Sequence, residues 1–286
     1  MFKITTFKRI AAFTAAVTAA VCALLAAGTF RTRKAVGKNA GAALTVLMYH
    51  QISDNGNLFG DYVIPASLLE EDFIYMKQNG FHPVSVEALC AYCKNGTPLP
   101  EKAVLITFDD GQRSFLTKVV PLLEKYSYPA VVNIIGSLAE LYTQNGETDD
   151  RYAYLNRDDI KLLSENPLVE IGNHSHNMHS LAGRRGMGKT AGESDADYAA
   201  AVTADIRKAQ ACLTEYTGEA PSVFAYPYGI VNDMLFEIVK SEGFVVTLTC
   251  RECENMLIPG GELYELGRFN RPFGISSAAF FEKITR

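Results

Sequence analysis

The sequence predicts an α/β fold built on a parallel sheet or barrel, and three observations support this. Short apolar segments alternate with helical segments, which is the order of parallel strands and crossover helices. The strand segments are apolar at successive positions, as in Ala103–Phe108 (AVLITF), so we expect both sheet faces to be covered. The length of 286 residues suits one large α/β domain after a short N-terminal segment.

The first 28 residues have the pattern of an export segment. Lys3, Lys8 and Arg9 precede an uncharged apolar run over residues 10–28, as in a signal peptide, and about 19 residues also suffice for a transmembrane helix. The pattern leaves open whether this segment is cleaved or stays as a membrane anchor. In both cases we expect an extracytoplasmic protein, secreted or anchored at the cell envelope. Residues 29–43 are predicted to be a linker and residues 44–286 the catalytic domain.

Strands and helices alternate through this domain. The predicted strands are Thr45–Tyr49, Pro83–Ser85, Ala103–Phe108, Ala130–Ile135, Val169–Gly172, Val223–Tyr226 and Val245–Thr249. The predicted helices are Leu68–Asn79, Val86–Lys94, Leu116–Tyr126, Arg157–Glu165, Asp195–Thr217 and Asp233–Glu242. The segment Leu138–Tyr154 is expected to be a polar loop.

The net charge and the number of histidines limit the classes of function that this protein can have. The formal net charge is −5, and every charged residue among the first 40 is basic, so the rest of the chain is more acidic than this value. An acidic chain after residue 40 argues against nucleic-acid binding. The chain has five histidines and no tryptophan, which limits the residues available for catalysis.

Side chains that follow parallel strands gather at one end of a barrel. His50 follows the first predicted strand, Asp109 and Asp110 follow Ala103–Phe108, and three histidines lie in residues 174–179 (HSHNMH). One aspartate and two histidines leave open positions on a divalent ion, as catalytic sites require. Neighbouring side chains on an extended strand point apart, so the second aspartate can act as a base. A turn or helix cap is the alternative for the aspartates, and a polar loop for the histidines.

Three segments resemble the motifs of the polysaccharide deacetylases, the NodB-homology domains of carbohydrate esterase family 4. They are TFDDG at Thr107–Gly111, GNHSHNMH at Gly172–His179 and AYPYG at Ala225–Gly229. LMYH and LGRFN, at residues 47–50 and 266–270, extend the resemblance to roughly residues 44–280. It implies a distorted (β/α)7 barrel, similar to a TIM barrel. It also implies a hydrolase that removes N-acetyl groups from an extracellular or cell-envelope polysaccharide, such as peptidoglycan, a chitin-like polymer or poly-N-acetylglucosamine.

The resemblance also implies roles for individual residues. Asp109 would be the general base, and a divalent metal ion, expected to be Zn²⁺, would be bound by Asp110, His174 and His179. Tyr228 would donate its backbone N–H to the oxyanion, with Pro227 and Gly229 shaping the turn. We also expect Tyr49, beside His50, to contact the substrate.

Three departures from the family pattern leave questions open. The two ligand histidines are five residues apart rather than four, which makes His176 a rival ligand. The usual arginine of the third motif is absent, so we expect Arg268 to pair with Asp109, the alternative being a surface arginine. No histidine follows His179, so His50 is the candidate acid, with water- or substrate-assisted proton transfer as the alternative.

Other interpretations remain at this point. Cys90/Cys93 and Cys250/Cys253 form two CxxC pairs, for which we favour disulfides or free thiols over a shared metal site. An O-acetyl esterase acting on a xylan-type glycan and a non-catalytic glycan-binding protein are the competing functions. We expect an acetylated glycan partner, a membrane contact only through an uncleaved N-terminal segment, and a monomer.

Overall fold

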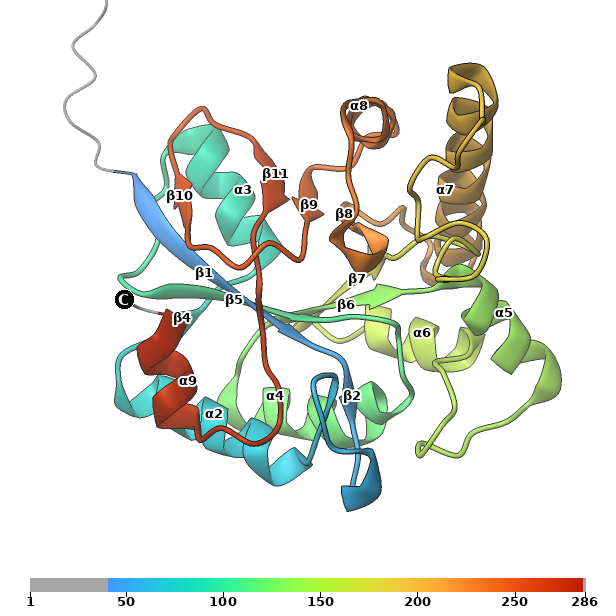
Figure 1. Cartoon of the computed structure of the whole chain (residues 1–286). Helices are drawn as coiled ribbons and strands as arrows, with labels where there is room; N and C mark the ends of the chain where they lie inside the picture. Colours follow the sequence, from blue (N-terminus) through green and yellow to red (C-terminus); the bar gives the residue numbers. More distant parts are fainter. Residues whose placement is uncertain (1–40, 285–286) are drawn as a thin grey trace, which may run out of the picture. The chain divides into compact units, whose positions relative to one another are not determined.

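The computed structural model describes residues 41–284, and a single large sheet organises them (Figure 1). The order of its strands is β10-β1-β5-β6-β7-β8-β9-β11, with β4 beside β5 and β12 beside β1. The parallel strands that carry the site are β1 (Ala42–Tyr49), β5 (Ala103–Phe108), β6 (Ala130–Ile134), β7 (Val169–Asn173), β8 (Val223–Ala225) and β9 (Val246–Leu248). β1 thus begins with Ala42, and its interior residues are buried, as the apolar pattern predicts.

One late segment nearly closes this sheet into a barrel. β11 (Leu263–Leu266) pairs with β9, and β12 (Phe269–Asn270), only three residues later, pairs with β1 at the other side. The buried Asn255, on the antiparallel strand β10 (Asn255–Leu257), secures the closure. Its amide donates to the carbonyls of Leu44 and Gly267 and accepts from the Gly267 N–H. The predicted α/β barrel is therefore confirmed.

Helices cover the outside of the sheet. They are α2 (Ala66–Gln78), α3 (Val86–Asn95), α4 (Val120–Tyr126), α5 (Gly136–Asn145), α6 (Arg157–Ser164), α7 (Asp195–Thr217), α8 (Asp233–Ser241) and α9 (Ser277–Ile284). Short helical turns lie at η1 (Gly56–Leu58), η2 (Phe115–Val119) and η3 (Pro227–Gly229), and short strands at β2 (Gln51–Ile52), β3 (Val63–Ile64) and β4 (His82–Pro83). The C-terminal α9 lies beside α2 (Figure 1).

Two predicted elements differ from the structure. The first half of the expected loop Leu138–Tyr154 belongs to α5, which packs on α7 and buries Ala139. This tertiary contact stabilises a helix whose own sequence has few apolar positions. The predicted helix Leu116–Tyr126 is divided into the π-helical turn η2 and α4. Pro121 lies in the first turn of α4, where its missing N–H costs no helical hydrogen bond.

The predicted export segment, residues 1–28, lies outside the described residues. Within residues 41–284, no helix is both long and apolar enough to cross a membrane.

Candidate active site

The predicted site residues lie where the parallel strands end. His50 follows β1, Asp109 follows β5, His174 follows β7, and Pro227 lies two residues after the end of β8. The parallel pairing of β1 with β5, and of β7 with β8, brings these ends to the same side of the barrel. Arg268 reaches them from the segment that closes the sheet.

Asp109 and Arg268 form a buried, two-pronged ion pair. Both Nη atoms of Arg268 donate to the Asp109 carboxylate, each at 2.7 Å, and the arginine side chain is fully buried. Arg268 Nε donates to the Thr249 carbonyl, and Nη1 also donates to Thr107 Oγ1. The fork geometry of the guanidinium matches the two carboxylate oxygens, so the orientation of Asp109 is fixed.

The charge of Asp109 is fixed as well as its orientation. Burial alone raises the pKa of a carboxyl group, but the Arg268 guanidinium outweighs it and holds the pKa of Asp109 far below its usual range. Asn133 on β6 adds a hydrogen bond of 2.8 Å to Asp109 Oδ1. A Cβ on Gly172 would lie 2.1 Å from Asn133 Oδ1, so only glycine leaves room for this amide. Asp109 is thus a permanent carboxylate.

The neighbouring Asp110 has the opposite environment. Its backbone is in the left-handed region, with φ of 73°, so the chain turns and the two carboxylates diverge. Burial, followed by the charge of Asp109, raises the pKa of Asp110 to about 7. Asp110 Oδ1 lies 3.6 Å from His174 Nε2 and 3.4 Å from His179 Nε2. Asp110 therefore belongs with the histidines rather than with Arg268.

Both histidines are oriented by their surroundings. The buried His174 directs Nδ1 to the Ala225 carbonyl at 2.8 Å, so Nε2 is left for a ligand. Burial lowers the pKa of His174 to about 3, so its ring is neutral at pH 7. The ring of His179 stacks on Tyr228, with centroids 4.6 Å apart. These contacts hold two neutral imidazoles beside one carboxylate.

Asp110, His174 and His179 fit a divalent metal ion. One ligand atom from each lies within 4.8 Å of the others, and they are the only such cluster in residues 41–284. Asp110 Oδ1 is buried and has no hydrogen-bond partner among the described residues, although an unpaired buried oxygen is costly. A cation would satisfy it. Neutral histidines with a carboxylate are a zinc-type donor set that leaves a coordination position open.

His176 lies apart from this cluster. Its Nε2 is 3.5 Å from Glu140 on α5, and its backbone N–H donates to Asp205 on α7. Asp205 also accepts from the backbone N–H of Asn177, so one carboxylate holds the turn of the loop. Neither Asp205 nor Asn133 was among the predicted site residues. A polar Asn in the otherwise apolar strand β6 was the available signal for Asn133, whereas nothing local distinguishes Asp205 from other acids on its helix.

His50 lies close enough to Asp109 and Arg268 for their charges to act on it. Burial lowers the pKa of His50 to about 4, so the ring is neutral at pH 7. Its Nδ1 is buried without a hydrogen-bond partner among the described residues. The exposed His82 lies at the start of the short strand β4, away from the strand ends that carry the other predicted site residues. His50 is therefore the histidine outside the ligand cluster that faces the site.

The remaining residues that were predicted to contact the substrate lie in two different settings, a turn and the core. Tyr228 and Gly229 have left-handed backbones, with φ of 56° and 66°, in the turn that begins at Pro227. A Cβ on Gly229 would lie 2.6 Å from Cys250 Cβ, so this turn requires glycine. The expectation for Tyr49 is wrong in this structure. It is 1% exposed, its ring stacks on Phe108, and its hydroxyl donates to Asp72, so it supports the core.

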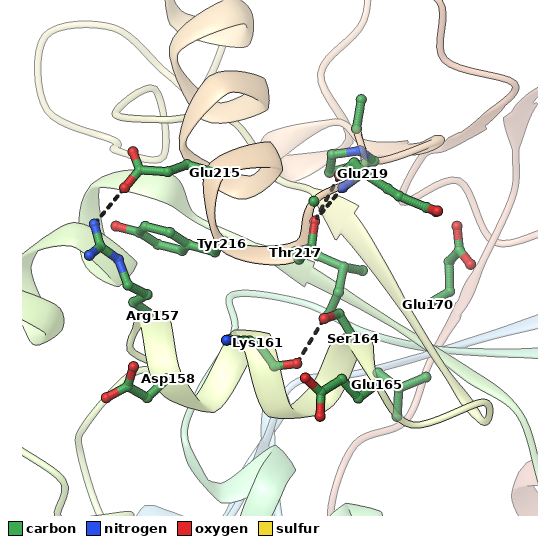
Figure 2. Close-up of a pocket in the computed structure, with 15 residues that line it drawn as sticks. Arg157, Asp158, Lys161, Ser164, Glu165, Glu170, Glu215, Tyr216, Thr217 and Glu219 are labelled. Carbon is green, nitrogen blue, oxygen red and sulfur yellow. Dashed lines mark hydrogen bonds and ion pairs between the residues drawn. The ribbon is translucent and has the colours of Figure 1, made fainter.

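Two other features contribute no ligand atom to the cluster of Asp110, His174 and His179. A polar cavity of about 680 Å³ opens between α6, the end of α7 and the start of β7 (Figure 2). It adjoins Glu170 near the amino end of β7, whereas His174 follows the carboxyl end. Cys90, Cys93, Cys250 and Cys253 are free thiols, and they form no metal cluster within the described residues.

The fold and these side chains together define an α/β barrel protein with a candidate metal site at the strand ends. The polysaccharide deacetylase family model matches residues 96–247, more than half of the chain. The chain therefore belongs to the polysaccharide deacetylase family, and the predicted family and enzyme class are confirmed.

Relatives and solved structures agree with this assignment. The chain is 28% identical over 222 residues to the poly-β-1,6-N-acetyl-D-glucosamine N-deacetylase of Escherichia coli K12, which covers 71% of this chain but only 33% of that protein. The enzyme of the same name from Staphylococcus aureus MRSA252 is 26% identical over 227 residues, covering 79% and 72%. A de-N-acetylase structure from Aggregatibacter actinomycetemcomitans superposes with a TM-score of 0.70 at 24% identity, covering 85% and 99%, which supports the fold.

The Arg268–Asp109 pair predicts a specific kinetic defect. In Arg268→Ala, Asp109 loses its orienting partner, so we expect kcat to fall by about 100-fold while the metal content is unchanged. Without the guanidinium the pKa of Asp109 rises, so the acidic limb of the pH–rate profile moves to higher pH. Steady-state kinetics and metal analysis by mass spectrometry measure both effects. The exposed Arg251→Ala is the matched control. Unchanged turnover in Arg268→Ala contradicts this role.

The geometry also predicts which histidine binds the metal. His179→Ala removes one of three ligands and should lose the ion. His176→Ala should retain it, because His176 faces Glu140 instead. Metal-to-protein ratios of the purified variants after dialysis measure this, with the exposed His82→Ala as control. The reverse pattern, with the metal lost from His176→Ala and kept by His179→Ala, would assign the ligand to His176.

Proposed function

We propose that this protein is a metal-dependent N-deacetylase of a cell-envelope or extracellular polysaccharide that contains N-acetylglucosamine. Membership of the deacetylase family supports this proposal. The names of the E. coli and S. aureus relatives support a poly-β-1,6-N-acetylglucosamine substrate. The chain spans only about a third of the E. coli protein, so the substrate is proposed mainly on the more complete S. aureus match.

One observation carries the proposal: a permanently charged carboxylate lies beside a separate three-ligand cluster. His174 Nε2 is 3.9 Å from Asp109 and 3.6 Å from Asp110, so the two groups share one small space. The positive charge of Arg268 balances the negative charge of Asp109, so Asp109 does not compete as a ligand for the cation. This division supplies a proton acceptor and a cation site at the same strand ends, which amide hydrolysis requires.

Each residue of the site then has its own role in the proposed reaction. Asp110, His174 and His179 would hold a divalent cation such as Zn²⁺, which would supply polarisation of the acetyl carbonyl and a lower pKa for water. Asp109 accepts the proton of the attacking water. The backbone N–H of Tyr228, positioned by its left-handed turn, donates to the developing oxyanion. His50 protonates the leaving nitrogen, because an amide anion is a poor leaving group. Acetate and a free amine on the sugar are the products.

His50 begins this cycle without a proton, since burial holds its pKa near 4. Hydrolysis places negative charge on the oxyanion and delivers a proton from water into the same buried site. Nearby negative charge raises the pKa of an imidazole, and the unpartnered Nδ1 is a free acceptor. His50 therefore gains the proton that Asp109 accepted from the attacking water and passes it to the leaving nitrogen, which returns Asp109 to its ionised form and His50 to its neutral form.

The site of action is proposed from the sequence. The basic and apolar pattern of residues 1–28 supports an extracytoplasmic enzyme, whether this segment is cleaved or anchors the protein in a membrane.

Acetate release tests the proposed activity and its metal dependence. We expect the purified protein to release acetate from a β-1,6-linked N-acetylglucosamine pentamer. Dipicolinate should reduce this rate to background, because it removes the cation that polarises the carbonyl, and added Zn²⁺ should restore it. An enzymatic acetate assay measures each rate. Activity that is unaffected by chelation contradicts metal dependence.

Other substrates and a variant sharpen this experiment. A chitin pentamer and acetylated xylan are assayed in parallel, and Asp109→Asn is the inactive control. Acetate from xylan alone supports an O-acetyl esterase and overturns N-deacetylation. Binding of an oligosaccharide without acetate release supports a non-catalytic glycan-binding protein.

The proposed acid role of His50 predicts a dependence on the leaving group. His50→Ala should lower kcat on the pentamer by about 100-fold or more, because the amine must be protonated as it leaves. Hydrolysis of 4-nitrophenyl acetate should change much less, since its leaving group is a stable anion. Because His50 begins the cycle neutral and gains its proton during turnover, the difference between the two leaving groups is the measurement that reports its role as an acid. An equal loss of rate on the pentamer and on 4-nitrophenyl acetate in His50→Ala counts against this role.

A further inference from the structure

The two proposed ligand histidines are held in different ways. His174 directly follows strand β7, and its ring is oriented by the bond from Nδ1 to the Ala225 carbonyl. His179 lies five residues further on, after residues 175–178, which we call the ligand loop. Its ring stacks on Tyr228, and a hydrogen bond of 3.5 Å joins Nδ1 to the tyrosine hydroxyl. The position of His179 therefore depends strongly on the course of the ligand loop.

The carbonyl groups of the ligand loop are bound by the start of α5. The Ser175 carbonyl accepts from the Gly136 N–H at 3.0 Å. The carbonyl of the next residue, His176, accepts from the Ser137 N–H at 2.9 Å. A Cβ on Gly136 would lie 2.8 Å from His176 Nδ1, so the first turn of α5 packs directly against the loop. The first N–H groups of a helix have no partner within the helix, and here two of them bind the ligand loop.

The N–H groups of the ligand loop are bound by α7. Asp205 directs both of its carboxylate oxygens at the loop backbone. Oδ1 accepts from the His176 N–H and Oδ2 from the Asn177 N–H, each at 2.8 Å. Hydrogen bonds to an ionised acceptor are stronger than those between neutral groups. One side chain of α7 thus fixes two successive peptide groups that lie between the two histidines.

The ligand loop needs this support because its backbone is strained. Ser175 has a φ of 69°, in the left-handed region that is unfavourable for residues other than glycine. Its N–H donates to the side chain of Asn173, whose amide donates to Gln210 on α7. Such a conformation persists only where the surrounding structure holds it. α5 and α7, which pack on each other beside the end of β7 (Figure 1), supply that support.

Resting on the proposed metal site, we propose that Asp205 is a positioning residue that raises the affinity for a divalent cation by holding His179 in place before the ion binds. A ligand on an unrestrained loop has to be ordered when the ion binds, and this ordering lowers the affinity. Without Asp205 the two N–H groups lose their acceptor, and the strained loop can relax. His174 would keep its bond to the Ala225 carbonyl, so the loss falls on His179.

This arrangement also gives the middle histidine of the motif a structural role. His176 is 5% exposed, and its Nε2 lies 3.5 Å from Glu140 on α5. Its carbonyl binds α5 and its N–H binds α7. The backbone of His176 therefore joins both helices to the ligand loop. The helix α5, which the sequence analysis expected to be a loop, is part of the support of the metal site.

The Zn²⁺ affinity of the purified, metal-free full chain tests this role. In Asp205→Ala we expect the Kd for Zn²⁺ to rise by about tenfold to 100-fold, as is typical when a group that orients a metal ligand is removed. Asp205→Asn keeps the size of the side chain but replaces one acceptor oxygen by an N–H donor, so its Kd should also rise. Competition with a fluorescent zinc chelator measures each Kd. Glu215→Ala, which removes an exposed acid near the end of the same helix, is the matched control and should keep the wild-type Kd.

Melting curves with and without Zn²⁺ separate this role from a purely structural one. If Asp205 positions His179, a fixed Zn²⁺ concentration should raise Tm less in Asp205→Ala than in the wild type, because a more weakly bound ion stabilises less. An equal loss of Tm with and without Zn²⁺, at an unchanged Kd, means that Asp205 supports only the fold and overturns the inference. If Asp205→Ala does not fold, the same two measurements on Asp205→Asn decide.

The outcome for the wild type keeps this inference distinct from the proposed function. A wild-type protein that binds no Zn²⁺ overturns the proposed metal dependence first and this inference with it. A wild-type protein that binds Zn²⁺ with the same Kd as Asp205→Ala overturns this inference alone, while the proposed function stands.

Discussion

The site depends on the buried pair between Asp109 and Arg268. Both side chains are almost fully removed from solvent, and a buried charge of either sign is tolerated only when it is paired and hydrogen-bonded. The pair meets this condition through two bonds of 2.7 Å and through the bonds of Arg268 to Thr249 and Thr107. Because each partner alone would be strongly destabilising, the strand that ends at Asp109 and the segment that carries Arg268 are constrained to stay together.

This constraint coincides with the closure of the sheet. Arg268 lies between β11, which pairs with β9, and β12, which pairs with β1. Three residues later on the same segment, the buried Arg271 pairs with Asp72 of α2 at 2.8 Å. Side chains three positions apart on an extended chain point to opposite sides. The same segment therefore places Arg268 against Asp109 and Arg271 against Asp72 of α2. The closure of the barrel and the formation of the site thus depend on one segment.

Much of this site was readable from the sequence, because its residues follow strands that have clear apolar patterns. His50, Asp109 and His174 lie at strand ends, and the position of a strand end is a local property. The pairing of Arg268 with Asp109 was inferred from a missing arginine elsewhere. By contrast, Asp205 and α5 depend on contacts between distant segments, which no local pattern reports. Tyr49 illustrates the same limit: it adjoins His50 in sequence, yet strand alternation turns it into the core.

The two adjacent aspartates show how one dipeptide can perform two functions. Arg268 holds the pKa of Asp109 far below its usual range, whereas burial and the charge of Asp109 raise the pKa of Asp110 to about 7. Titratable groups whose environments separate their pKa values usually have separate roles. Asp109 stays ionised without a metal ion, because Arg268 already balances its charge. With a pKa of about 7, Asp110 is only partly ionised at neutral pH, and a nearby cation would favour its charged form. Its Oδ1 lies beside Nε2 of both His174 and His179. The left-handed turn at Asp110 therefore separates the proposed base from the proposed ligand, and the ion pair with Arg268 keeps Asp109 charged.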